Sequence, residues 1–479
     1  MNRRSWLKRR PVQAGLLCTL LASCTVGPDY QAPTVPVPVN WSSELAAGQD
    51  QARSANLAAW WENLDDPVLS DMIARAIANN PDQKNALAVV RQARALRGVS
   101  RSGLFPDVSA NGSASTTLSE DTSGDIVSDE LYSAGLDASW ELDVFGSVRR
   151  QVEAADANLE AREADYFDVL TSLSAEVALA YVDTRTLQEQ LRITRANLTA
   201  QQETYDLTRW REEAGIVTML DVEQALTNLA STRALVPGYE SDLASALNSL
   251  SVLIGEAPGG LDTAILQAAS LPVAPSSMPM GIPANLLRQR PDIRSAERDL
   301  ASQSARVGVA VANLYPGLQL FGSIGSSSTE ISDLFNSASF AESIGTSVTA
   351  PIFNAGRLRQ NVEIEDALYE QALAAYESAV LGALKETEDA LASVTAARKR
   401  TLALDDAVSA ARRAYQLARQ EYESGLTDFD QVLDAQRTLL TQEEGFVQSK
   451  SSEIKAMISL YKALGGGWNP AALVDVEPS

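Results

Sequence analysis

Two aspartates in the C-terminal part of the sequence, Asp430 and Asp434, are spaced so that they could act together on ions. Residues four apart lie on the same face of a helix, so the two carboxylates would form one negative patch. Repeated by symmetry around a narrow passage, such patches would form rings that attract cations and repel anions. The alternative is that acidic residues early in a helix only complement the helix dipole. Both interpretations require a helix that begins shortly before Asp430.

The composition argues against catalysis and metal binding. The 479 residues include no histidine and only two cysteines, Cys18 and Cys24. The sequence has no P-loop, no nucleophile-elbow glycine pattern and no metal-ligand cluster. The net charge of −23 makes nucleic acid an unsuitable partner. We therefore expect no enzyme, no metal site and no cofactor apart from the lipid discussed next.

The N-terminus has the pattern of a bacterial export signal. Basic residues within positions 3–10 precede an apolar run, Val12 to Ala22, that is too short to span a bilayer. The sequence Leu21-Ala22-Ser23-Cys24 resembles the lipobox of bacterial lipoproteins. This resemblance implies that residues 1–23 are removed and that Cys24 carries N-acyl and diacylglycerol chains. Thr25, in place of an aspartate, implies sorting to the outer membrane. The alternative is a secreted soluble protein with a stray cysteine.

The two halves of the sequence match each other at an offset of 210 residues. Pro81-Asp82 matches Pro291-Asp292, and Leu104-Phe105-Pro106 matches Leu314-Tyr315-Pro316. We interpret this match as an internal duplication. The predicted organisation is a signal peptide at 1–23, a lipid-anchored arm with an equatorial part at 24–80, a first repeat at 81–254, a linker at 255–290, a second repeat at 291–464 and a tail at 465–479.

Each repeat contains a region with the period of β-strands. From Tyr132 to Leu142, apolar or small residues alternate strictly with polar ones. The same pattern, weaker in the second repeat, predicts four strands at about 107–119, 130–143, 316–328 and 340–352. Each is long enough for a tilted transmembrane β-strand.

Long helices follow each strand pair. Neither proline nor glycine interrupts Ser147 to Trp210, and apolar residues recur there with a heptad spacing. Such a helix would be a rod of about 96 Å, and residues 357–421 predict a second one. Shorter helices at 82–102, 216–254, 292–312 and 426–464 would accompany the rods. We therefore expect each repeat to be a helical hairpin with two strands at its other end.

These elements predict a pore made by several chains. Four amphipathic strands cannot close a barrel, and lipid does not tolerate an open sheet edge. Several copies must therefore contribute strands to one barrel, and at least two chains are needed because known membrane barrels begin at eight strands. The polar strand faces would line a wet lumen.

Four sequence runs together resemble the TolC-type outer-membrane efflux channels, in the lipoprotein branch that includes NodT, OprM and CusC. The resemblance covers nearly the whole mature chain. It implies an α+β membrane protein: a homotrimer with a 12-stranded transmembrane β-barrel, continued by a periplasmic α-helical barrel of coiled-coil hairpins. It also implies outer-membrane lipids, a periplasmic adaptor (membrane fusion) protein and an inner-membrane transporter of the resistance-nodulation-division (RND) type as partners. The four runs are WELDVFGSVRR, LLRQRPDIRSAERDL, APIFNAGRLR and YESGLTDFDQVLDAQRTLL.

The resemblance also assigns roles to residues near the hairpin turns. Gly215 and Gly425 would form the periplasmic tip turns that contact the adaptor, although a turn between helices needs such a residue in any case. Leu433 and Asp434 match the constriction positions of the family, and Asp430 joins them only if it also faces the lumen. The other acidic ring position of the family is Gln431 here.

Asp221 and Tyr422 match a gate latch that links neighbouring helices in the closed state. The basic partner of that latch is not evident, because the matching position is Thr427.

The function that these observations favour is the exit channel of a tripartite efflux pump, gated at its periplasmic tip and conducting drugs or metal ions. The alternatives are a TolC-like channel for protein secretion and a non-conducting coiled-coil scaffold at the cell surface. A scaffold would explain the heptads but not the four alternating strands. The sequence identifies neither the cargo nor the individual pump.

Overall fold

The computed structural model describes residues 25–38, 41–42, 57–120, 122–261, 263–267, 269–275, 289–336 and 339–469. The predicted signal peptide, Cys24 and residues 470–479 lie outside this described part. The described residues divide into two compact units. Unit 1 takes its residues from 25–34, 89–163 and 295–377, and unit 2 from the remaining described ranges. Four helices contribute residues to both units: α3 (Pro81–Ser102), α4 (Ser147–Glu213), α8 (Pro291–Ala312) and α9 (Arg357–Glu423).

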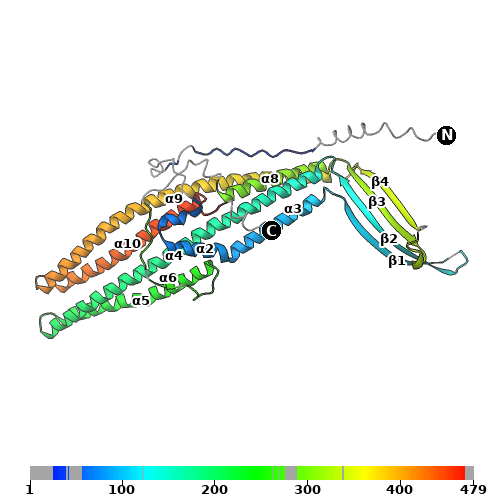
Figure 1. Ribbon diagram of the computed structural model, residues 1–479. Coiled ribbons are helices and arrows are strands. Elements are labelled where there is room, and N and C mark those ends of the chain that lie inside the picture. The colour runs from blue at the N-terminus through cyan, green and yellow to red at the C-terminus, as the bar shows by residue number, and fades with distance from the viewer. Residues whose placement is uncertain are drawn as a thin grey trace. The chain divides into compact units, whose positions relative to one another are not determined.

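Unit 1 contains an antiparallel sheet of four strands in the order β1-β2-β3-β4 (Figure 1). The strands are β1 (Asp107–Glu120), β2 (Ile126–Leu142), β3 (Gly317–Ser328) and β4 (Phe340–Thr349), with the 3₁₀ turn η2 (Ile331–Asp333) between the last two. Strand β4 ends three residues earlier than the sequence predicted. Pro351 follows it and has no N–H to donate to a ladder. β1 and β4 are the edge strands.

The register of the ladders separates apolar from polar side chains. Val108, Ala138, Gly322 and Ile344 lie in one row across the sheet, and the next row contains Ser109, Asp137, Ser323 and Ser343. Because successive side chains of a strand point to opposite faces, one face is apolar and the other polar. On the polar face, the hydroxyl oxygens of Ser323 and Ser343 are 2.8 Å apart. The alternation predicted from the sequence is therefore present in the sheet.

Unit 2 contains two helical hairpins, each ending in a tight turn (Figure 1). In the first, α4 is followed by α5 (Met219–Leu253), and in the second, α9 is followed by α10 (Phe429–Ala463). The helices predicted from periodicity agree with these bounds to within three residues. With 67 residues, α4 and α9 are each about 100 Å long.

The core of unit 2 packs the short N-terminal elements against the hairpins. These elements are η1 (Leu57–Leu64) and α2 (Pro67–Asn79), and α6 (Thr263–Leu266) lies in the segment between the two halves. Trp60 is fully buried and stacks on Tyr461 with ring centroids 5.2 Å apart. Val177 and Tyr181, on the apolar side of α4, are also fully buried.

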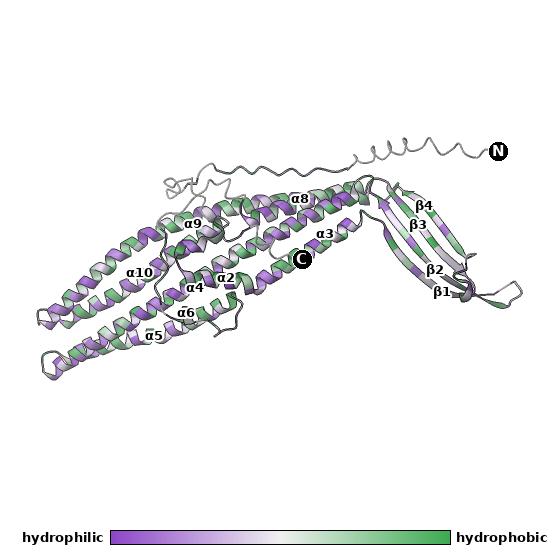
Figure 2. Ribbon diagram, viewed as in Figure 1, coloured by the Kyte–Doolittle hydropathy of each residue, from purple (hydrophilic) through white to green (hydrophobic). Residues whose placement is uncertain are grey.

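The helices of the described part carry hydrophilic and hydrophobic residues interspersed along their length (Figure 2). None of these helices is both long enough and apolar enough to cross a membrane.

Candidate functional site

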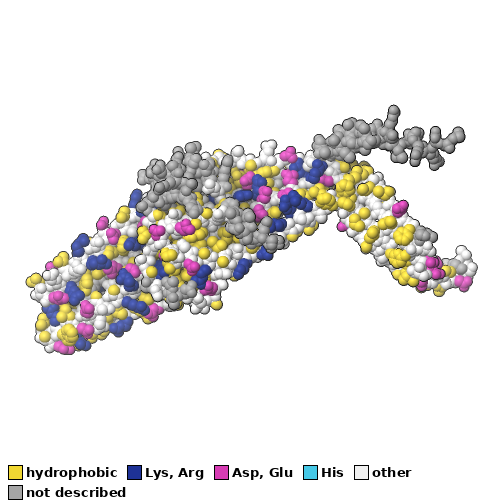
Figure 3. Space-filling view, in the orientation of Figure 1, with side chains coloured by type: hydrophobic (Ala, Val, Ile, Leu, Met, Phe, Trp, Pro, Cys, Tyr) yellow, Lys and Arg dark blue, Asp and Glu magenta, His cyan; other side chains and the backbone are white. Residues whose placement is uncertain are grey.

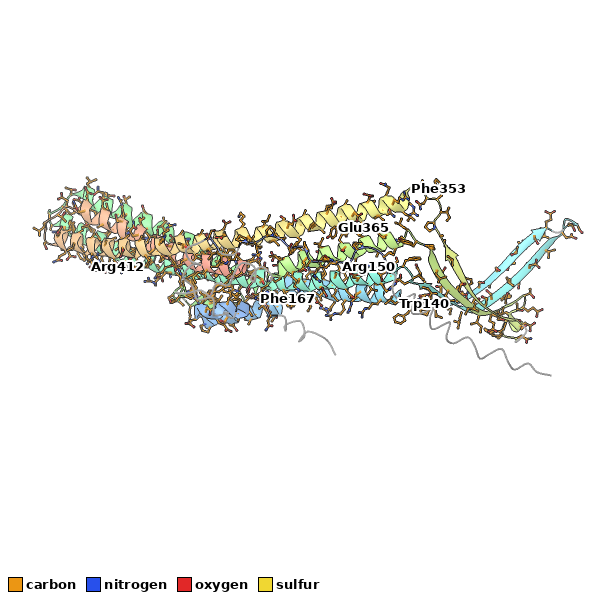
Figure 4. All side chains as sticks on the ribbon, turned by 90° about the horizontal axis from the view of Figure 1, so that it is seen from above. Trp140, Arg150, Phe167, Phe353, Glu365 and Arg412 are labelled. Carbon is orange, nitrogen blue, oxygen red and sulfur yellow. The ribbon has the colours of Figure 1, made fainter. Side chains whose placement is uncertain are left out.

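The turns of the two hairpins lie at the same end of unit 2 (Figures 1 and 4). Gly215 and Gly425 have φ angles of +74° and +73°, a conformation that glycine adopts at little cost. The N–H of Gly215 donates to the carbonyl oxygen of Glu212, and that of Ile216 donates to Arg211. Gly425 and the residue after it make the corresponding bonds. Both turns are thus Schellman motifs, which reverse the chain abruptly after a long helix. We call this end of unit 2 the tip.

A small apolar cluster holds the two hairpins together at the tip. Its buried members are Ala225 from α5 and Tyr422, Phe429, Val432 and Leu433 from the second hairpin. Leu433 is only 4% exposed in the single chain. The sequence-based hypothesis places Leu433 at a lumen constriction, and this stays a prediction. Within the single chain, the Leu433 side chain packs in the apolar cluster of the tip.

Arg211, in the last turn of α4, joins the first hairpin to the second. Its Nη1 donates a 2.8 Å hydrogen bond to the backbone carbonyl oxygen of Tyr422 on α9. Its guanidinium carbon also lies 4.5 Å from the centre of the Tyr422 ring, which is a cation–π contact. One side chain therefore holds both the backbone and the ring of Tyr422.

The two residues of the predicted latch do not meet within one chain. The carboxylate of Asp221 accepts hydrogen bonds of 2.8 Å from the N–H and the hydroxyl of Thr218, at the start of α5. The Tyr422 hydroxyl is buried and has no hydrogen-bond partner in the part of the chain that the structure describes. A latch between these residues would therefore have to join different chains.

Asp430 and Asp434 lie in the first two turns of α10, as the sequence predicted, and both are exposed. Among the described residues, neither carboxylate pairs with a basic side chain. Gln431, between them, is exposed as well. The tip thus presents two unneutralised negative charges on one helix.

Just behind the tip, a buried polar layer takes one residue from each helix of the two hairpins. Gln436 of α10 donates to Thr204 of α4 at 2.9 Å and to Tyr415 of α9 at 3.3 Å, and its carbonyl oxygen lies 3.5 Å from the Asn228 amide of α5. Arg437 also donates to Asn228. Buried polar groups cost free energy unless they are hydrogen-bonded, so this layer favours one register of the hairpins.

Another contact between the hairpins is titratable. The hydroxyl of Tyr239 on α5 donates a 3.0 Å hydrogen bond to Glu444 on α10. Burial, and then the charge of Glu444, raise the pKa of Tyr239 to about 12. Burial also raises the pKa of Glu444 above that of an ordinary glutamate, although the bond from Tyr239 opposes this shift.

Comparison with known proteins gives the family of this chain. The family model described as outer membrane efflux protein matches residues 72–256 and again residues 282–466. The chain belongs to the outer membrane efflux protein family. It is therefore an outer-membrane efflux protein, as the sequence resemblance implied.

Similar proteins cover almost the whole chain. SrpC, a solvent efflux pump outer membrane protein of Pseudomonas putida, is 34% identical over 460 residues, which are 94% of this chain and 97% of SrpC. OpmQ, a pyoverdine export outer membrane protein of Pseudomonas aeruginosa, is 35% identical over 94% of this chain and 95% of its own length. Among solved structures, the outer-membrane channel OprN has a TM-score of 0.87 at 36% identity, covering 93% of this chain and all of OprN.

Sequence reasoning identified the tip turns and the exposed aspartates but missed Arg211. The family resemblance places the basic partner of the latch at position 427, which is a threonine here. A local feature of the sequence could have identified Arg211. It is a basic residue in the last turn of a long helix, where its side chain can contact the residues that pack against that turn. No pattern in the sequence marks the contact with Tyr422, which comes from α9 about 210 positions later.

Proposed function

We propose that this efflux protein is a homotrimeric conduit, with a 12-stranded barrel in the outer membrane and a tube of helical hairpins in the periplasm. Its cargo is small molecules, drugs or metal ions, delivered by a periplasmic adaptor and an inner-membrane RND-type transporter. The protein performs no chemistry on them. The family assignment supports the pump role, since the relatives named above are outer membrane proteins of efflux pumps.

The two-faced sheet with two open edges is the observation that carries the proposal. An edge strand in lipid leaves backbone groups unpaired, each at a cost of several kcal/mol. Pairing β4 of one copy with β1 of the next removes every edge when the ring closes. The apolar face then meets lipid, and the polar face lines water. The antiparallel order of the four strands allows such a pairing to be antiparallel too.

The tip is the proposed gate. In a trimer, the exposed Asp430 and Asp434 would repeat around the axis as rings of carboxylate that favour cations. Neither carboxylate has a basic partner in the described part of the chain, which supports this role over a purely structural one. The latch between Tyr422 and Asp221 of a neighbouring copy is part of the proposal, and it requires the tip to rearrange so that the buried Tyr422 hydroxyl becomes accessible. Gly215 and Gly425 would present the turns to the adaptor.

Two further features belong to the proposal. Cys24 is lipidated and anchors the chain to the outer membrane. The chain also arose by internal duplication, which is supported by an offset of 210 residues between α3 and α8, between α4 and α9, and between α5 and α10. The two matches of the family model are displaced by the same offset.

Chemical cross-linking of the sheet edges tests the assembly. Ser109 on β1 and Ser343 on β4 lie in one row of the polar face, at opposite edges of the sheet. A chain carrying both Ser109→Cys and Ser343→Cys, treated in membranes with a flexible bis-maleimide, is expected to give covalent dimers and trimers. The matched controls carry only one of the two cysteines and should give no ladder. A doubly substituted chain that remains monomeric would contradict the proposal.

A further inference from the structure

Unit 1 contains a hollow of about 560 Å³ between its helices. The hollow takes side chains from α3, α4, α8 and α9, all from the stretches of these helices that belong to unit 1. Its volume lies within the range of sites for small organic molecules, roughly 300–1,000 Å³. Figure 4 marks Glu365 on α9, one of the residues that line it. The polar part of the lining includes Gln151, Asn158, Arg306, Asn361 and Glu365.

Hydrogen bonds between neighbouring helices hold the walls of the hollow in place. The Ser302 hydroxyl of α8 donates to the carbonyl oxygen of Ala154 on α4 at 2.8 Å. The side-chain amide of Gln303, also on α8, donates to the Glu365 carboxylate of α9 at 2.6 Å. An ion pair joins α3 to α4. The four helices are thus linked in the order α3, α4, α8, α9 around the hollow.

Arg306 brings an unpaired positive charge to this hollow. Figure 3 shows basic and acidic side chains mixed along the helices. On α4 and α8, for example, Arg162 pairs with Asp299, and Arg298 pairs with Glu160 at 3.2 Å. Arg306 is exposed and forms no ion pair or hydrogen bond with the residues that the structure describes. Its guanidinium has five N–H donors and no acceptor.

The other polar side chains of the lining add further donors. Gln151, Asn158 and Asn361 each carry an amide NH₂ group, and none of these side chains is hydrogen-bonded to another described residue. Among the described residues of the lining, Glu365 is the one carboxylate, and its Oε2 already accepts the bond from Gln303. Free donors therefore outnumber free acceptors, which suits an anionic ligand.

The hollow also has apolar walls. Leu96 of α3 and Ile364 of α9 line it, with exposed fractions of 54% and 55%, and Val309 and Leu358 line it too. Covering such side chains with the apolar part of a ligand removes them from water, which is favourable. The lining as a whole suits a molecule that has an acidic group on an apolar body.

The hollow lies on the face of α8 that points away from residues 25–29. Gly308 of α8 packs against Arg150, since a Cβ added to Gly308 would lie 2.9 Å from the Arg150 Cδ. Arg150 in turn donates to the Asp29 carboxylate at 2.7 Å. Residues two apart in a helix point about 200° apart, so Arg306 points away from Gly308 and from that segment. A hollow lined by four successive helices lies on the concave side of their layer.

We propose that this hollow binds small organic anions with an apolar body, and that Arg306 supplies the charge that holds their acidic group. The inference rests on the proposed function, because a closed ring of copies would place three such hollows on the inner wall of the tube. It adds a cargo-binding site whose charge is opposite to that of Asp430 and Asp434 at the tip. A guanidinium can bind a carboxylate through two parallel hydrogen bonds, which would also orient the ligand.

The test measures binding of naphthalene-2-sulfonate to the full-length, detergent-extracted protein by saturation-transfer difference NMR, with protein-free micelles as the background. Naphthalene-2-methanol is the neutral probe of similar shape. The variants are Arg306→Gln and Arg306→Lys. Arg101→Gln is the matched control, because Arg101 on α3 is exposed, has no partner among the described residues and lies outside the lining.

The wild type should bind the sulfonate saturably and the neutral probe several-fold more weakly. Arg306→Gln should raise the dissociation constant for the sulfonate about tenfold, as expected for the loss of hydrogen bonds from a charged group. It should leave binding of the neutral probe unchanged. Arg306→Lys keeps the charge but not the planar group and should be intermediate. Arg101→Gln should bind both probes as the wild type does.

Single-channel recording in planar bilayers then tests where the hollow lies. The sulfonate, added to both sides, should reduce the conductance of the wild type and of Arg101→Gln, and should reduce that of Arg306→Gln less.

Three results would overturn the inference. Equal binding of the two naphthalene probes by the wild type would show that the hollow does not select an anion. Equal binding of the sulfonate by the wild type and Arg306→Gln would remove Arg306 from the site. A wild type that conducts ions but is unaffected by the sulfonate would show that the hollow does not face the conducting path. A wild type without any conductance would instead contradict the proposed conduit, and the NMR comparison would still decide whether the hollow binds organic anions.

Discussion

Arg211 offers a quantitative test of how the two hairpins are held together at the tip. Its hydrogen bond to the Tyr422 carbonyl involves a charged donor, which contributes about 1.5–3 kcal/mol, and a cation–π contact at a partly exposed site adds about 0.5–1 kcal/mol. Allowing for solvent, we expect Arg211→Gln to weaken the connection between the hairpins by about 2 kcal/mol in each chain. That value corresponds to about a thirtyfold change in an equilibrium between closed and loosened tips.

Single-channel recording in planar bilayers measures this change. Arg211→Gln should increase the fraction of time in high-conductance states, and Arg211→Lys should have an intermediate effect because it keeps the charge but not the planar group. The matched control is Arg209→Gln, since Arg209 pairs with Glu213 at 3.7 Å on the same helix end. If Arg211→Gln and Arg209→Gln both behave as the wild type, the contact with Tyr422 does not hold the tip closed.

Three further predictions concern the tip and the hairpins. Asp434→Asn should lower the cation preference of the conductance, measured as a shift of the reversal potential in a salt gradient. An unchanged reversal potential would show that Asp434 does not line the lumen. Leu433→Ala should destabilise the tip by about 2–4 kcal/mol in hydrogen exchange, whereas a lumen-lining leucine would cost little. Burial raises the pKa of Glu444 in the folded state, so the folded protein favours the protonated carboxyl. The contribution of Glu444 to folding stability is therefore fully present below about pH 4 and is lost as the pH rises through the raised pKa. Glu444→Gln should therefore flatten the fall in melting temperature above that pH, and an identical pH profile would contradict the assignment.

Much of the fold could be predicted because its signals are periodic and long. Strict alternation from Tyr132 to Leu142 predicts a strand with one apolar and one polar face. The register of the ladder confirms that these residues pair in the sheet. The long run after Gly146 without proline or glycine predicts one long helix. The strand limits were less predictable. β2 begins at Ile126, four residues before the predicted start, because β1 continues to Glu120 and pairs with it.

The candidate site was predicted less well than the fold. Gly215 and Gly425 could be located because a turn residue with positive φ has a sequence signature. Aspartates in the first two turns of a helix have one too. Contacts between the hairpins have none. The packing of Leu433 into the tip and the contact of Arg211 with Tyr422 depend on how far two helices rotate against each other, and residue spacing does not fix that rotation.

The clearest test of the central claim is single-channel recording of the purified, detergent-extracted wild-type protein in planar bilayers. A polar lumen formed by several copies and narrowed by the carboxylates of Asp430 and Asp434 predicts discrete, low and cation-preferring conductance steps. Membrane insertion without any conductance step, at any salt concentration, would contradict the claim that this chain forms a conduit.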